Sequence, residues 1–573
     1  MEEFILPVKP IYVKPPLAVL HAVPLGPGQV RSQKEELTAL YKLTRDLSKN
    51  VETWEGTFRL GCIVAENPEE EPIVSVIRSA LEAQKEDGSF DMDIPQSIAL
   101  VRAALALYEY GNERTILRQV ALWCGWVNVH FDEVIGLTYV RTHSADLMEI
   151  LEKVYRFTGK VALLSLCDRL RMGSMNWSSI LHTFGIKRPM NQIASWLETR
   201  AGMDREKDSE NGLYTRQFLT GHAETLADGM RAAYLNGLYS GSRDEATAGP
   251  EGWQKIFRWH GMPCGGTSAD ETLEGNNPSS AMDAAALGAW AESLALQMMT
   301  RPSAWAAEAL DMLVHNALPA TVMKGSLVPY QRPNSVEKDI STRDCYRTRT
   351  VTEQKARSFS RLGRGWAQAM SSAVMTTAAG CILNLYLEGD YALALDGKAC
   401  RISVRPMGQE QVSLSFQCRE PIEATVSLRI FPWMREAALV KEGETLDQRQ
   451  DGDMLKVQAT LQSGDVWTLS WTNELHLTEE FHQGVSVIWG DIAMVLPVND
   501  EKTWMVAMVG KPELVDGKIM ASVQPIEGWG QTNGVPSPLP ILPERTTETY
   551  TNELVPYASM ATRITVFPRV NRT

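Results

Sequence analysis

A polar, glycine-rich segment, residues 264–283, holds the carboxylates that are best placed to do chemistry. It lies between two helical stretches, and its acids are Asp270, Glu271, Glu274 and, where an alanine-rich helix begins, Asp283. Functional groups concentrate on loops that a rigid scaffold positions. Two carboxyl groups in different environments can serve as general acid and general base. The segment therefore predicts a site for acid–base chemistry.

The same residues also have a purely structural interpretation. Ser279 or Ser280 can cap the helix that follows, because a side-chain oxygen accepts a hydrogen bond from the first turn. Asp283 would then interact favourably with the positive end of the helix dipole. From the residues alone, both interpretations stay open.

Three further segments carry polar or aromatic groups. His222, within Thr220–Glu224, precedes a helix and can bind a hydroxyl group or transfer a proton near neutral pH, or it can be a core or capping histidine. Tyr330 lies in the polar stretch Val328–Asn334, and Ser358–Trp366 is basic and glycine-rich. The alternative for both stretches is an ordinary surface turn. The second also lacks the Gly-Lys-Ser/Thr ending of a phosphate loop.

Hydrophobic periodicity divides the elements that must position these residues into two classes. From about residue 31 to 375, apolar residues recur at helical spacings, as in Ser97–Tyr110, Ala145–Phe157 and Met282–Met299. Beyond about residue 378 the period is two, as in Val412–Gln417 and Leu455–Leu461, with Gly and Asp at the turns. The chain is thus predicted to be helical first and strand-rich afterwards.

The helical part repeats one unit, in which a helix, a short turn and a second helix follow one another. The turns share Gly or Pro, and they are Tyr110–Glu113, Phe157–Lys160, Tyr239–Ser242 and Thr300–Ser303. About a dozen helices in stacked hairpins are what an (α/α)6 toroid requires, although an open solenoid shows the same local pattern. The predicted fold class is therefore α + β multidomain, an (α/α)6 toroid followed by β-sandwich domains. The predicted boundaries are 1–30 for an extended N-terminal arm that pairs with the C-terminal sandwich, 31–377 for the (α/α)6 barrel, 378–481 for the first β-sandwich and 482–573 for the second.

Composition excludes several classes of partner. The net charge is −14 and no run of Lys and Arg occurs, so neither nucleic acid nor an anionic membrane is an expected partner. No window approaches the roughly 18 apolar residues that span a bilayer, and the N-terminus does not have the pattern of a secretory signal. The eight cysteines form no CxxC pair, which indicates free thiols and a cytoplasmic location. No motif for zinc, phosphate or dinucleotide binding is present, so no cofactor and no metal are expected.

Several short motifs occur in an order that resembles one family. They are Gln84–Phe90, Gly221–Ala223, Asp270–Glu271 with Pro278–Ser279 and a following acid, Asn316–Pro319, Gly363–Trp366, Ser427–Trp433 and Val485–Gly490. Each motif is weak by itself, but together they cover nearly the whole chain in the same order as in the non-reducing-end β-L-arabinofuranosidases, glycoside hydrolase family 127. The resemblance implies an (α/α)6 barrel with β-sandwiches and an oligosaccharide or small glycoside as partner. C-terminal sandwiches in such chains also suggest a homodimer.

The resemblance assigns roles to individual residues. Glu271 falls on the family's acid/base, His222 on its conjoint histidine, and Tyr330 resembles its sugar-contacting tyrosine. Asp283 is then the second catalytic candidate. The remaining residues expected to bind substrate are Asp270, Arg357, Ser358 and Trp366.

The metal site of the family does not carry over. Its zinc is held by one glutamate and three cysteines, and these positions hold Asp283, Ala285, Arg357 and Ser358 in this chain. Without thiolates, neither the zinc cage nor the cysteine nucleophile can form. Three interpretations follow: a metal-independent glycoside hydrolase, a carbohydrate-binding protein without catalysis, or a lyase or hydrolase for an acidic sugar. The last rests on Arg357, Arg361 and Arg364, since guanidinium groups pair well with carboxylates.

Overall fold

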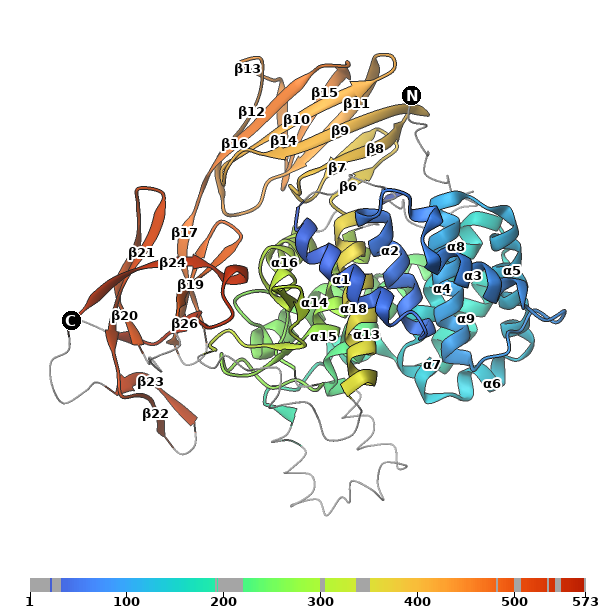
Figure 1. Ribbon diagram of the computed structural model, residues 1–573, viewed down its shortest axis with the longest axis horizontal. Coiled ribbons are helices and arrows are strands. Elements are labelled where there is room, and N and C mark those ends of the chain that lie inside the picture. The colour runs from blue at the N-terminus through green and yellow to red at the C-terminus, as the bar shows by residue number, and fades with distance from the viewer. Residues whose placement is uncertain are drawn as a thin grey trace.

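The computed structural model describes residues 21–22, 32–190, 193, 220–269, 271–298, 304–335, 351–480, 483–498, 506–532, 535–541 and 548–570, with the backbone alone described for 21–22, 351–357, 528–532 and 535–541. Helices form one part of the molecule and strands form two others (Figure 1). The helices are α1 (Lys34–Asp46), α2 (Trp54–Val64), α3 (Pro72–Glu82), α4 (Ile94–Gly111), α5 (Arg114–Val129), α6 (Phe131–Gly136), α7 (Thr138–Thr142), α8 (Ser144–Thr158), α9 (Ala162–Gly173), α10 (Trp177–His182), α13 (Ala223–Ser240), α14 (Arg243–His260), α15 (Ala284–Met298), α16 (Ala304–Met312) and α18 (Val351–Ser371).

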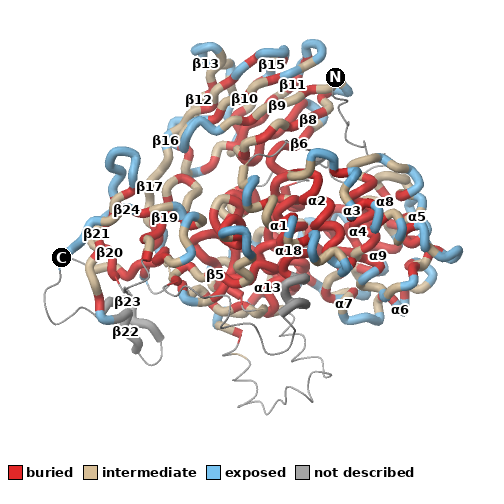
Figure 2. The backbone as a smooth tube through the Cα atoms, viewed as in Figure 1, coloured by how far each residue is buried: buried red, intermediate tan, exposed pale blue. Residues whose placement is uncertain are grey.

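Among these, α2, α4, α8, α13, α15 and α18 contact one another in this order, and α18 returns to contact α2. We call them the inner helices. Each packs against a second helix. For α2, α4, α8, α13 and α15 this is the helix that follows next in the sequence (α3, α5, α9, α14 and α16), whereas α18 packs against α1 from the start of the chain. The inner helices are mostly buried, whereas the surrounding helices expose one side to solvent (Figure 2). The cyclic order of these contacts is a property of the packing and not of any single helix.

The inner helices run in the same direction. Glu55 of α2 pairs with Arg102 of α4, and one turn later Arg59 pairs with Glu109. The same ascending order joins α4 to α8, α8 to α13, α15 to α18 and α18 to α2. Because the helices are parallel, their N-terminal ends gather on one side of the ring, which we call the mouth.

Three glycines let the inner helices approach closely. A Cβ at Gly288 of α15 would lie 2.4 Å from the carbonyl oxygen of Arg361, and one at Gly365 of α18 would lie 1.9 Å from the carbonyl oxygen of Gly288. A Cβ at Gly56 of α2 would lie 3.1 Å from the carbonyl oxygen of Ser360. Any larger residue at the first two positions would force α15 and α18 apart.

The turns predicted between helices are present where the structure describes them. Asn112, Gly159 and Gly241 end α4, α8 and α13 with left-handed backbone angles. These are the residue types that adopt this conformation at a helix C-terminus with least strain. The fourth predicted turn, Thr300–Ser303, lies outside the described residues.

Within the described part of the chain, the strands form three large sheets and three small pairs. They are β1 (His21–Ala22), β2 (Met282–Asp283), β3 (Val322–Met323), β4 (Ser326–Leu327), β5 (Tyr330–Gln331), β6 (Val374–Thr376), β7 (Gly380–Leu383), β8 (Gly389–Leu395), β9 (Lys398–Pro406), β10 (Gln411–Cys418), β11 (Ile422–Arg429), β12 (Met434–Lys441), β13 (Glu444–Thr445), β14 (Gln448–Asp451), β15 (Met454–Leu461), β16 (Val466–Asn473), β17 (Leu475–Glu479), β18 (Val485–Trp489), β19 (Ile492–Pro497), β20 (Val506–Val515), β21 (Lys518–Pro525), β22 (Gly528–Thr532), β23 (Val535–Ile541), β24 (Tyr550–Pro556), β25 (Arg563–Ile564), β26 (Val566–Phe567) and β27 (Arg569–Val570).

Two six-stranded sheets, β1-β6-β7-β11-β15-β14 and β13-β12-β16-β10-β9-β8, lie over the helices in Figure 1. Their strands bury every second residue, for example Val412, Leu414 and Phe416 of β10, as the period of two predicts. The buried side chains of both sheets belong to one continuous core with those of the helices. The C-terminal sheet, β17-β18-β19-β24-β21-β20-β27, has a smaller core of its own. The chain is therefore a multidomain α + β protein.

The predicted boundaries divide two pairs of strands. Position 378 falls between β6 and β7, which pair with each other, and position 482 falls between β17 and β18, which also pair. Of the N-terminal arm, the described residues His21 and Ala22 pair with β6 of the first sheet and not with the C-terminal one. Pairing of the rest of the arm stays a prediction. None of the helices in the described ranges is both long and apolar enough to cross a membrane.

Candidate active site

The acidic loop of residues 261–283 lies beside the mouth and is fastened by a buried histidine. His260, the last residue of α14, accepts a hydrogen bond at Nδ1 from the backbone N–H of Gly275 (2.9 Å), and its Nε2 lies 2.9 Å from the carbonyl oxygen of Ile186. The N–H of Ser268 donates to the carbonyl oxygen of His260 at 2.8 Å. Burial lowers the pKa of His260 to about 4, so the ring is neutral and Nε2–H donates to Ile186.

Glu271 sits where this loop meets the N-terminus of α13. Its carbonyl oxygen accepts a hydrogen bond from the N–H of Ala223 (3.0 Å), and the N–H of Leu273 donates to the carbonyl oxygen of Gly221 (2.8 Å). Glu271 has a φ of 59°. Such a left-handed conformation is uncommon for a residue other than glycine, and it recurs at functional sites. The loop therefore holds Glu271 directly beside His222.

His222 is the N-cap of α13, which is one of the two interpretations that the sequence left open. Its Nδ1 accepts from the N–H of Thr225 at 3.4 Å and lies 3.2 Å from the Thr225 hydroxyl. Since Nδ1 accepts, the proton of the neutral ring is on Nε2. A capping role and a position at the mouth are thus combined in one side chain.

Asp283 and Tyr330 are brought together by the short pair of β2 and β5. They lie directly opposite each other in an antiparallel register, and the N–H of Ala284 donates to the carbonyl oxygen of Pro329 at 2.9 Å. Asp283 Oδ1 accepts from the N–H of Ala285 at 2.9 Å and so caps α15. The alternative that a serine at 279 or 280 caps this helix is wrong, because α15 begins only at Ala284. Asp283 and Tyr330 are both buried.

Beneath the mouth, charged side chains from every inner helix form one buried cluster, which we call the ion network. Its members are Glu55, Arg102, Asp146, Glu149, Glu224, Asp228, Arg231, Glu292, Arg361 and Arg364. All are at most 9% exposed. Arg102 illustrates the density of contacts, with Glu55 at 2.7 Å and Asp146 at 2.8 Å. Charges this deep must be paired, because an isolated one would be prohibitively costly to bury.

The guanidinium groups of the ion network lower the pKa of several of its carboxylates. Burial by itself would raise the pKa of Asp228, but the guanidinium groups of Arg361 and Arg231 and the hydrogen bond from His143 lower it to about 2. His143, the N-cap residue of α8, lies with Nδ1 2.6 Å from Asp228 Oδ2. Burial likewise opposes ionisation of Glu55, and Arg102, Arg59 and Arg364 lower its pKa to about 2. The floor of the mouth is therefore a fixed array of opposite charges.

The remaining predicted site residues do not form one group. The stretch Ser358–Trp366 is part of helix α18, so the prediction of a surface turn is wrong: its glycines permit close packing of α18 against α2 and α15. Ser358 is buried on α18, and Trp366 is fully buried with its Nε1–H donating to Gln33 Oε1 at 3.0 Å. Asp270 and the side chain of Arg357 lie outside the described residues.

Sequence reasoning missed most of the ion network, including Asp228 and Glu292, and also His143, which contacts Asp228. A signal was present, because single charged residues interrupt otherwise apolar helical stretches, such as Arg102 in Ile98–Leu107 and Glu292 in Ala289–Leu296. A charge on the buried face of a helix needs a partner. The partners lie as far as 309 residues apart along the chain, as Glu55 and Arg364 do, and the sequence does not identify them.

A zinc–thiolate centre does not fit these residues. The positions that would hold its ligands carry Asp283, Ala285, Arg357 and Ser358. Cys264, at the start of the acidic loop, is buried with its Sγ 3.7 Å from Met282 Sδ. Burial raises the pKa of Cys264 to about 12, which disfavours the thiolate that both a metal ligand and a nucleophile require.

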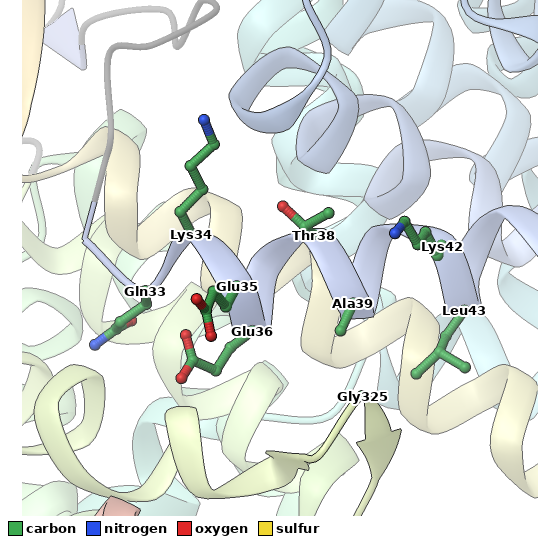
Figure 3. Close-up of a pocket in the computed structure, with 9 residues that line it drawn as sticks. All are labelled: Gln33, Lys34, Glu35, Glu36, Thr38, Ala39, Lys42, Leu43 and Gly325. Atoms are coloured by element: carbon green, nitrogen blue, oxygen red, sulfur yellow. The ribbon is translucent and has the colours of Figure 1, made fainter.

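A separate pocket of about 780 Å³ lies beside α1. It is lined by Gln33, Lys34, Glu35, Glu36, Thr38, Ala39, Lys42, Leu43 and Gly325 (Figure 3). None of the predicted site residues is among them, and Lys34 points away from Gly325. The pocket is therefore distinct from the mouth.

Comparisons with known proteins agree with this architecture. No family model matches the chain, and no curated protein matches it. Solved structures do match: one described as a glycoside hydrolase (TM-score 0.73, 14% identity, 98% of this chain and 99% of that one) and a GH127 β-L-arabinofuranosidase from Geobacillus stearothermophilus T6 (TM-score 0.67, 15% identity, 94% of each). A further GH127 β-arabinofuranosidase matches with a TM-score of 0.63 at 14% identity over 94% of this chain and 92% of that one. The resemblance predicted from the motifs is thus confirmed at the level of the fold.

Proposed function

We propose that the chain is a glycoside hydrolase that works without a zinc–thiolate centre, with an (α/α)6 toroid formed by the inner and surrounding helices and β-sandwich domains after it. An oligosaccharide or a small glycoside would bind at the mouth. The observation that carries the proposal is the backbone pairing that holds Glu271, in a left-handed conformation, beside His222 at the N-terminus of α13. The fold shared with β-L-arabinofuranosidases supports it.

In the proposed reaction, Glu271 donates a proton to the glycosidic oxygen as the bond to the anomeric carbon breaks. Asp283 removes a proton from the attacking water if the two carboxyl groups are about 6.5–9.5 Å apart in the complex, and attacks directly if they are about 5–5.5 Å apart. His222 and Tyr330 bind hydroxyl groups of the sugar. The positive ends of α13 and α15 favour negative charge on the reacting oxygens.

The test is release of sugar from a panel of aryl furanosides and pyranosides, uronates included, by chelator-treated protein. Glu271→Gln should lower turnover by about 10²–10⁴-fold, the usual contribution of a general acid. Glu274→Gln, in the same loop, is the matched control and should retain activity. A dinitrophenyl leaving group departs without protonation, so the defect of Glu271→Gln should shrink on that substrate. Equal release by wild type and Glu271→Gln would refute the proposal.

A second candidate is a carbohydrate-binding protein without catalysis. It is favoured by Ser358, which stands at a position of the thiolate pair and is buried on α18. Its signature is a sugar-induced rise in melting temperature without release from any substrate. The acidic-sugar interpretation is less well supported, because Arg361 and Arg364 are already paired with carboxylates of the ion network. Cytoplasmic location and a homodimer stay predictions from the sequence.

A further inference from the structure

A second polar cluster lies far along the chain from the acidic loop, where the helical part meets the C-terminal sheet. Asp311 is near the end of α16, and His315 is in the π-helical turn Leu313–Ala317 that follows it. Asp491 occupies the tight turn between β18 and β19. One ligand atom from each of these side chains lies within 4.8 Å of the other two. Among the described residues, this is the group of His, Cys, Asp and Glu with the spacing of a metal site.

The side chains approach closely and leave one buried carboxylate oxygen without a partner among the described residues. His315 Nδ1 is 3.4 Å from Asp311 Oδ1 and 2.5 Å from Asp491 Oδ2. Asp311 is 2% exposed, and no hydrogen bond from the described part of the chain reaches its Oδ2. Burying a carboxylate oxygen without a hydrogen-bond partner costs free energy. Such an atom in a native fold indicates a further partner, such as a bound ion.

The side chain of Asn316, next to His315 in the chain, holds the turn that carries Asp491 in place. Asn316 Nδ2–H donates to the carbonyl oxygen of Asp491 at 2.8 Å, and Asn316 Oδ1 accepts from the N–H of Ala493 at 2.8 Å. These bonds fix the turn between β18 and β19 against the π-helical turn. The position of Asp491 relative to His315 is therefore fixed by backbone contacts and does not depend only on the rotamers of the two side chains.

The spacing suits a small divalent cation. With bonds of about 2.1 Å, two ligand atoms on zinc lie roughly 3.0–3.4 Å apart. The distance from His315 to Asp311 is already 3.4 Å, and the distance from His315 to Asp491 would have to open from 2.5 Å by less than about 1 Å. One imidazole with two carboxylates favours a transition metal such as zinc over calcium or magnesium, which prefer oxygen ligands alone.

We infer that Asp311, His315 and Asp491 bind one divalent transition-metal cation of the zinc class, which ties the helical part to the C-terminal sheet. Two carboxylates would neutralise the cation, and the imidazole would supply the nitrogen ligand. The side chains of His315 and Asp491 are 24% and 14% exposed, so solvent reaches the edge of the cluster, whereas His315 Nδ1 and Asp311 Oδ2 are themselves buried. This site is independent of the proposed glycosidase activity.

The experiment is calorimetric titration of untagged, chelator-treated full chain with zinc chloride, with manganese and magnesium chloride for comparison. We expect one zinc per chain, weaker binding of the other two ions, and a higher melting temperature with zinc. Asp311→Asn and His315→Gln should each weaken zinc binding by more than about 100-fold, beyond the effect of losing an outer-shell group. His182→Gln is the matched control, because His182 has one carboxylate neighbour, Glu251 at 2.9 Å, and should bind zinc as the wild type does.

The absence of stoichiometric zinc binding, or equal binding by wild type and His315→Gln, would overturn the inference. If the variants fail to fold, the site is tested by anomalous diffraction from crystals of the wild type grown with zinc. An anomalous peak between His315 and Asp491 supports the site, and a peak elsewhere or none overturns it. Neither readout depends on activity, so the glycosidase proposal can fail while this one stands.

Discussion

Arg361 and Asp228 form a two-fold ion pair that joins α18 to α13. Arg361 Nη2–H donates to Oδ2 at 2.5 Å and Nη1–H donates to Oδ1 at 3.2 Å, while its Nε–H is directed at Glu224. Bidentate pairs of this kind fix geometry as well as charge. Arg361 is thus committed to holding the inner helices together, close to the point where His143 also reaches Asp228.

Removing one cation from the ion network should destabilise the fold strongly. Arg231 is fully buried and contacts Glu149 at 3.0 Å and Glu292 at 2.5 Å. Arg231→Met would remove one cation that Glu149 and Glu292 share with Arg102 and leave the buried network short of one positive charge, which costs about 3–5 kcal/mol. The measurement is the shift of the urea unfolding midpoint. Arg435→Met, which breaks the exposed pair with Glu474, is the control and should cost at most about 1 kcal/mol; equal shifts would contradict the structural role of the network.

Close packing of α15 against α18 should be sensitive to a single methyl group. Gly288→Ala places a Cβ 2.4 Å from the carbonyl oxygen of Arg361, so the helices must separate, at a cost of about 1–3 kcal/mol or more. Gly125→Ala in α5 meets no atom within 4 Å and should stabilise by up to about 1 kcal/mol through helix propensity. Melting temperatures of the two variants should move in opposite directions. An unchanged melting temperature for Gly288→Ala would show that α15 and α18 are farther apart than in this structure.

The histidine that fastens the acidic loop should make the chain sensitive to mild acid. The pKa of His260 falls from 6.5 to about 4 on folding, so its contribution is complete above pH 6.5 and is lost as the pH falls toward 4. The loss is at most about 3 kcal/mol. Melting temperature measured from pH 7 to pH 4 should fall for the wild type and less for His260→Gln, whose amide can both donate and accept. Identical profiles would exclude His260 as the titrating group.

A second acid-induced decrease in the free energy of unfolding should occur at lower pH. The pKa of Asp228 is about 2 in the folded chain and about 3.9 in an unfolded one, so its ion pairs contribute fully above pH 4 and are lost as the pH falls toward 2. Asp228→Asn removes this step, worth up to about 2.5 kcal/mol, and leaves the step of His260 unchanged. Unfolding by urea at pH 7, 4 and 2 separates the two windows, because the step of His260 falls in the first interval and the step of Asp228 in the second. A step at pH 4–2 that persists unchanged in Asp228→Asn must come from other carboxylates of the network.

Much of the secondary structure is predictable from the pattern of apolar residues. Ala145–Phe157 and Val412–Gln417 coincide with α8 and β10 to within about one residue at each end. For Ser358–Trp366 the prediction of a surface turn is wrong, because glycines are typical of turns. In the structure these glycines lie inside α18, where a side chain would collide with α15 or α2. Local sequence cannot distinguish a glycine needed for a turn from one needed for close contact.

Part of the candidate active site is also predictable from the sequence, namely the acidic loop and the histidine before α13. The pairing of Glu271 with Ala223, and of Asp283 with Tyr330, joins segments 48 and 47 residues apart and follows from no local pattern. The cluster of Asp311, His315 and Asp491 is still less predictable, because a turn in the C-terminal sheet supplies its third member.

The sequence by itself determined the kinds of element and their order, because the apolar period is a local property that backbone geometry converts directly into helix or strand. The tertiary structure alone decided which charges share the interior of the ring. Burial removes water from these charges, so their ionisation and the free-energy cost of burying them depend on partners from six helices. The distances between the partners exist only once these helices have packed together.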